Sequence, residues 1–141
     1  MTDKNISLNE AIKFHGHLGP YLVLGLLAGE LAIQELSANK YFGVKIKVWG
    51  ATEKPKSCLI DGLQLSTGAT YGKGNIEKFK GKAIRILFTN LQTGVSLDLS
   101  LRGDLIKKVE TLKGHADSEA MARQIYNTRR TTYGAFRIRH L

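Results

Sequence analysis

The apolar residues of this chain gather most densely between about Pro20 and Leu36, a stretch that is apolar on nearly all sides. A helix with this pattern is expected to lie buried at the centre of a domain. Pro20 suits its first position, where no backbone N–H is needed. Small residues recur at helical spacing along this stretch and predict that another backbone approaches closely there: Gly25, Ala28, Gly29 and Ala32.

Alternating apolar and polar positions predict three strands, over residues 43–50, 83–89 and 95–101. The connection 90–94 has the length of an antiparallel hairpin loop. Helices are predicted over 6–13, 58–67, 104–113 and 117–129, with caps at Ser7, Ser57, Asp104 and Asp117 or Ser118. The tail 133–139 is expected to add a short strand, to this chain or to a partner subunit. Because the elements do not repeat as βαβ units, the predicted fold class is α+β, an antiparallel sheet packed against helices around the buried, glycine-rich helix.

Length and composition predict a single domain over residues 1–141. The longest apolar run is too short to cross a membrane, and the first residues lack the features of a signal peptide, so we expect a cytoplasmic protein. Cys58 is the only cysteine. It excludes a disulfide within the chain and a cysteine-rich zinc ribbon, and it fits a reducing compartment.

The formal net charge of +9 indicates either an anionic partner or a solvated basic surface, and the sequence favours the surface. Only the C-terminal stretch is densely basic, at Arg123, Arg129, Arg130, Arg137 and Arg139. No zinc-finger, helix-turn-helix or RNA-binding signature accompanies it. Binding of nucleic acid by this basic tail is therefore an alternative function that composition alone supports.

The candidate chemistry lies at two predicted helix starts. His15 and His17 precede the helix at Pro20, and Cys58 follows the predicted cap Ser57. A helix N-terminus favours neutral imidazole and thiolate. Two imidazoles and one thiolate suit Zn²⁺ and leave a fourth position for water, substrate or Asp61. Asp61 or Glu53 could instead orient the histidines.

Other interpretations of these residues stay open. His15 and His17 could pack in a core, and a lone helical cysteine is commonly a small buried hydrophobe. Cys58 could also be a nucleophile with His15 or His17 as its base, which would make the protein an enzyme. We expect His115 and His140 to be surface residues.

The glycine-rich turn 68–75 is one residue short of a Walker A motif and follows a predicted helix instead of a strand. We therefore exclude a phosphate-binding loop of that type. Lys73 in this turn remains a candidate to bind a small anionic ligand, or is an ordinary exposed lysine.

Two longer motifs resemble a known family, that of the E subunit of formylmethanofuran dehydrogenase. Residues 14–20, FHGHLGP, resemble its F-H-G-H-x-C-P signature, and residues 57–75 resemble its S-C-x-x-D-x-x-Q-x-x-T-G-x-T-x-G-K-x-N signature. The resemblance implies an intracellular, dimeric, accessory protein of one-carbon or molybdopterin-linked metabolism. It also implies metal ligands His15, His17 and Cys58, and the pocket residues Asp61, Gln64, Thr67 and Lys73.

The chain departs from these signatures at two positions. Gly19 stands where the family has a cysteine before the proline, and Ala69 stands where it often has a second cysteine. The loss of a thiolate at position 19 removes one soft ligand. We therefore expect a divalent metal site, with zinc preferred, that is chemically altered relative to the family.

Overall fold

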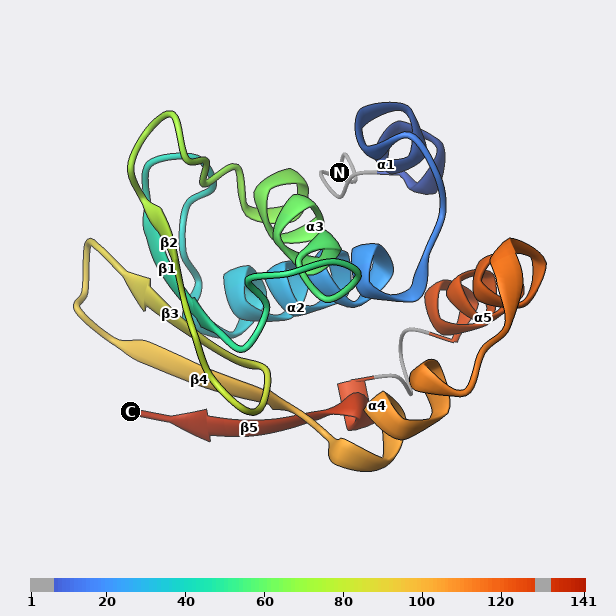
Figure 1. The fold of residues 1–141 in the computed structure, drawn as a ribbon. Coiled ribbons are helices and arrows are strands. Elements are labelled where there is room, and N and C mark those ends of the chain that lie inside the picture. The colour runs from blue at the N-terminus through green and yellow to red at the C-terminus, as the bar shows by residue number, and fades with distance from the viewer. Residues whose placement is uncertain (1–6, 129–132) are drawn as a thin grey trace.

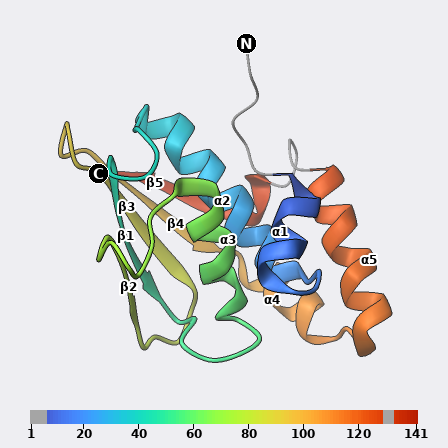
Figure 2. The ribbon, with the colours of Figure 1, turned by 90° about the horizontal axis from the view of Figure 1, so that it is seen from above.

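A five-stranded sheet carries the helices on one of its faces (Figures 1 and 2). The computed structural model describes residues 7–128 and 133–141. In these residues the elements follow in the order α1 (Leu8–His15), α2 (Pro20–Leu36), β1 (Val44–Trp49), α3 (Cys58–Thr67), β2 (Ile76–Phe79), β3 (Arg85–Asn90), β4 (Ser96–Leu101), α4 (Gly103–Glu110), α5 (Gly114–Asn127), a 3₁₀ turn (Tyr133–Ala135) and β5 (Phe136–His140). This is the predicted α+β class.

The strands are arranged in the order β2-β1-β3-β4-β5. All neighbours are antiparallel except β1 and β2, which run parallel. The predicted hairpin is confirmed, with Phe88 opposite Leu97. The tail strand pairs with β4 of its own chain, so its alternative place on a partner subunit is wrong. Strand β2 was not predicted, because its four residues, Ile-Glu-Lys-Phe, are too few to show a period.

Helix α2 fills the centre of the fold, as its apolar surface predicts. Every residue from Pro20 to Ala32 is buried, and the helix packs against α3, α5 and β4. The inward side chains of the sheet complete this core, among them Ile46, Ile86, Phe88, Leu97 and Leu99. No helix in the described part of the chain is long and apolar enough to cross a membrane.

The small residues of α2 let the backbone of α3 approach closely. A Cβ atom on Gly25 would meet the carbonyl of Leu59, and one on Gly62 would meet the carbonyl of Leu22. Further along, Gly29 faces Ser66. Contacts therefore advance in the same direction along both helices, so α2 and α3 begin at the same end of the molecule. The predicted close approach is confirmed, and its partner is the helix that carries Cys58.

Helix starts agree with the sequence at α1 and differ elsewhere. Ser7 and Glu10 form a reciprocal capping box at α1, as predicted. Ser57 precedes α3, but its side chain makes no capping hydrogen bond. Helices α4 and α5 begin at Gly103 and Gly114, so Asp104 and Asp117 lie in the first turns instead of capping them. The predicted end of α5 at residue 129 falls outside the described residues.

Candidate metal centre

His15 is the last residue of α1, where the chain turns sharply. Gly16 has a φ of 102°, in the left-handed region that favours glycine, and its N–H donates to the carbonyl of Ile12. The turn leads through His17 to Pro20, the first residue of α2. The end of α1 and the start of α2 thus bring both histidines to the N-terminal end of α3, where Cys58 is the first residue.

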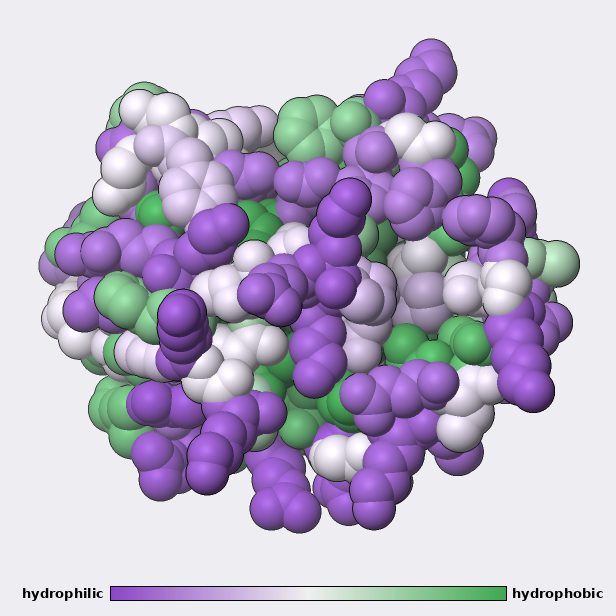
Figure 3. All heavy atoms as spheres, in the orientation of Figure 1, coloured by the Kyte–Doolittle hydropathy of each residue, from purple (hydrophilic) through white to green (hydrophobic). Residues whose placement is uncertain are grey.

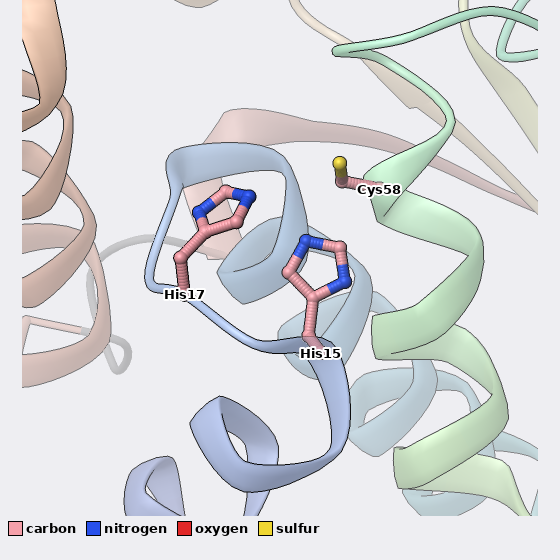
Figure 4. A group of neighbouring side chains, drawn as sticks. All are labelled: His15, His17 and Cys58. Carbon is pink, nitrogen blue, oxygen red and sulfur yellow. The ribbon is translucent and has the colours of Figure 1, made fainter.

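The three side chains point toward one another (Figure 4). His15, His17 and Cys58 each offer one ligand atom, and these atoms all lie within 4.8 Å of one another. The two imidazole rings have their centroids 4.7 Å apart. Among the described residues this is a cluster of three different metal-binding groups drawn from three segments of the chain. The sequence predicted its members, and the structure brings all three together.

Asp61 holds His15 in place from the first turn of α3. Its Oδ2 lies 2.6 Å from Nδ1 of His15. The other ring nitrogen, Nε2, is buried and has no hydrogen-bond partner among the described residues, in a side chain that is only 10% exposed. A carboxylate on Nδ1 favours the tautomer that leaves the lone pair on Nε2. Asp61 therefore orients His15, one of the two predicted roles for it. Glu53 borders a separate hollow near Gly81.

The donor set fits a divalent ion such as Zn²⁺. Tetrahedral zinc with nitrogen and sulfur ligands separates its ligand atoms by about 3.4–3.7 Å. The cluster, at 4.8 Å or less, needs to close by about 1 Å, which side-chain rotation supplies. A buried imidazole nitrogen without a partner costs free energy unless something occupies it. The chemistry and the orphaned Nε2 both match a metal ligand.

Cys58 is a protonated thiol in this environment without an ion. Burial raises the pKa of the Cys58 thiol, the carboxylate of Asp61 raises it further, and Lys54 opposes the shift. The sequence led us to expect a thiolate favoured by the start of α3. Desolvation outweighs that effect here, because α1 and the turn after it cover the helix end. A bound cation would restore the thiolate by displacing the proton.

A cavity of about 190 Å³ lies beside the cluster. His17, Gly19 and Cys58 form one wall, and His115 and Ser118 of α5 form another. The ring of His115 lies edge-on to that of His17, with 6.4 Å between centroids. His115 is exposed, as expected, but its place at this cavity was not predicted. Nothing in the sequence signals it, since it comes from α5, which is brought here only by packing against α2.

The remaining predicted pocket residues lie at the opposite end of α3. The hydroxyl of Thr67 donates to the carbonyl of Leu63 and accepts from the N–H of Ala69. Oε1 of Gln64 accepts from the N–H of Tyr71. Lys73 lies in the exposed turn beyond them. Within one chain the structure therefore does not bring Gln64, Thr67 and Lys73 to the histidine–cysteine cluster.

Comparison with known proteins agrees with the resemblance. The family model described as "FmdE, Molybdenum formylmethanofuran dehydrogenase operon" matches residues 14–136. A crystal structure of an FmdE-like protein of tungsten formylmethanofuran dehydrogenase, from Syntrophus aciditrophicus, superposes with a TM-score of 0.60 at 20% identity, covering 100% of this chain and 77% of that one. It supports the fold. No curated protein matches. With the family model spanning nearly the whole chain, the protein belongs to the FmdE family.

Proposed function

We propose that this protein binds one divalent metal ion per chain, preferably zinc, through His15, His17 and Cys58. The observation that carries the proposal is Nε2 of His15, which is buried, unpartnered and directed at two other potential ligands. Asp61 supports it by fixing the tautomer of that ring. As a member of the FmdE family, the protein would serve one-carbon or molybdopterin-linked metabolism in an accessory role, in the cytoplasm and as a homodimer.

Three protein ligands leave one coordination position open, which is the arrangement of metal sites that bind a further ligand. That position would face the cavity between His17, Cys58 and α5. A bound zinc ion there would act as a Lewis acid toward a small anionic or carbonyl ligand. His115 and Ser118, on the far wall, are placed to contact such a ligand. The raised pKa of Cys58 counts against the alternative of a metal-free cysteine nucleophile.

Zinc titration against a chromophoric chelator tests the proposal. We expect one zinc per chain in the unaltered protein, and affinity reduced roughly 100-fold or more in His15→Ala and Cys58→Ala, since each removes one of three ligands. His140→Ala is the matched control, because His140 is exposed at the other edge of the sheet and should leave zinc binding unchanged. Equal zinc affinity in Cys58→Ala and the unaltered protein would refute the site.

A further inference from the structure

Five exposed side chains form what we call the aromatic platform: Tyr41, Phe42, Tyr71, Lys73 and Lys78. They come from the segment before β1, the loop before β2, and β2 itself. The three rings are 60%, 76% and 46% exposed. Figure 1 shows these loops at the end of the molecule away from α1, and Figure 3 shows pale and green, weakly polar to hydrophobic, side chains gathered over them among purple ones.

The backbone of Tyr41 is held in an unfavourable conformation. Its φ of 74° lies in the left-handed region, which is uncommon for a bulky residue. The N–H of Tyr41 donates to the carbonyl of Thr67 over 2.8 Å, and Nδ2 of Asn75 donates to the carbonyl of Tyr41 over 2.7 Å. Gly68 has no side chain because a Cβ atom there would meet Tyr41. Strain held in place by surrounding contacts is characteristic of functional surfaces.

The same motif residues hold the loop that carries Tyr71 and Lys73. Oδ1 of Asn75 accepts from the N–H of Thr70, and the hydroxyl of Thr70 accepts from the N–H of Lys73. Because these polar groups bond one another, they are not arranged to receive a polar ligand. What the loop presents to solvent is the set of aromatic rings and ammonium groups.

An ammonium group accompanies each ring. Nζ of Lys73 lies 5.8 Å from the ring centroid of Tyr41 and 5.2 Å from that of Phe42. Nζ of Lys78 lies 5.9 Å from the ring centroid of Tyr71. Neither lysine is paired with a carboxylate among the described ion pairs. Each contact rests on a flexible four-carbon stem, so the ammonium group can move from a ring to an incoming anion.

We infer that the aromatic platform binds a single strand of nucleic acid, with bases stacked on the rings of Tyr41, Phe42 and Tyr71 and phosphates neutralised by Lys73 and Lys78. Exposed rings beside unpaired cations are the combination that binds single strands, because every base offers a planar face and every phosphate a charge. The net charge of +9 favours a polyanion further. This inference is independent of the metal site, which lies at the other end of α3.

The structure disfavours two other binding surfaces. The basic tail is partly neutralised, since Arg139 and Arg85 both bond the buried Asp98. A second copy of the chain seated on the platform would bring two pairs of lysines together across the interface, which is unfavourable. Leu91 extends the apolar surface beside Phe42, with its N–H donated to the carbonyl of Gly43, so self-association is measured in the test below.

The test uses fluorescein-labelled oligo(dT) and oligo(U) of about 12 nucleotides, a length within the site sizes of single-strand binders. Fluorescence anisotropy should show binding that weakens steeply with salt. Phe42→Ala and Tyr71→Ala should each weaken it roughly tenfold, because each removes a stacking ring. Lys73→Gln and Lys78→Gln should weaken it and flatten the salt dependence. These positions are exposed, so the variants should keep the fold.

Matched controls are available in the same chain. Phe14→Ala removes a phenylalanine that is 58% exposed on α1, and Lys107→Gln removes an exposed lysine on α4. Both should bind as the unaltered protein does, and so should Cys58→Ala, which lacks a proposed metal ligand. Loss of binding in Arg137→Gln but not in Phe42→Ala would overturn the inference in favour of the tail. Equal binding of duplex DNA, no binding at all, or a dimer that only Phe42→Ala dissociates would also overturn it.

Discussion

The two ends of α3 solve opposite problems with similar residues. At the N-terminal end, Cys58 and Asp61 face the histidine turn, and a buried nitrogen of His15 is left without a partner. At the C-terminal end, Thr67 and the loop to Asn75 bond one another. The first end is built to receive an ion, and the second is built to hold a loop. Both belong to one continuous sequence motif, so a shared motif does not imply a shared pocket.

The contact between α2 and α3 supports both ends. It places Cys58 beside the turn at His17, and it positions the C-terminal end of α3 against Tyr41. The comparison can therefore be broken at this contact, where both ends should fail, or at either end, where only one should.

Gly62→Val should have the largest effect, because its side chain would overlap the carbonyl of Leu22 and the N–H of Leu26. Overpacking a backbone contact of this kind is expected to lower the free energy of unfolding by about 3 kcal/mol. Zinc affinity and the order of the Tyr41 segment should fall together. Urea denaturation measures the loss, with Gly103→Ala as control, since nothing lies within 4 Å of a Cβ at Gly103. Unchanged stability in Gly62→Val would contradict the close approach.

Asp61→Ala should affect only the metal end. Removing the carboxylate that orients His15 is expected to weaken zinc binding roughly 10- to 100-fold, as for other groups that position metal ligands. The control is Gln64→Ala, further along the same helix, which bonds the N–H of Tyr71 instead. Chelator competition separates the two variants. If both weaken zinc binding equally, the ends of α3 are not independent.

Gly19→Cys should strengthen the metal end by restoring the thiol found at this position in the family signature. The backbone there is extended, with a φ of −142°, and an added Cβ would lie 3.6 Å from Cε1 of His17. A fourth protein ligand closes the site, so we expect zinc to bind about tenfold more tightly or better. Gly19→Ala, which adds the Cβ without the sulfur, should show no gain.

The pH dependence of zinc binding should report the raised pKa of Cys58. The proton on the thiol competes with the ion, so zinc affinity should increase as pH rises, by about one logarithmic unit per pH unit until the thiol pKa is passed. Titration at several pH values measures this slope. In Cys58→Ala the contribution of that proton should disappear, and an unchanged slope there would show that the thiol does not bind the ion.

Asn75→Ala should have the smallest effect and should act only at the other end. It removes the hydrogen bonds to the carbonyl of Tyr41 and from the N–H of Thr70. Each contributes about 1 kcal/mol, so amide exchange at Tyr41 should accelerate roughly fivefold. Hydrogen-exchange mass spectrometry measures the change. Zinc affinity should stay the same, and a decrease would indicate coupling along α3.

Local patterns predicted most of the elements correctly. The bounds of α2 and α3 agree with the pattern, because Pro20, the apolar stretch, and Gly68 with its left-handed φ of 78° act on neighbouring residues. The caps of α3, α4 and α5 were wrong because a serine or aspartate near a helix start does not determine its own hydrogen bond. Strand β2 depends on its pairing with β1, which no short window contains.

The sequence by itself determined which residues could bind an ion, because His15, His17 and Cys58 stand at helix boundaries that the chain encodes locally. It also determined the close approach, through the glycines of α2. Only the tertiary structure decided that Nε2 of His15 is buried without a partner, that His115 joins the cavity, and that Lys73 lies far from the cluster. These outcomes depend on how α2 packs against α3 and α5, and packing joins residues whose separation along the chain carries no local signal.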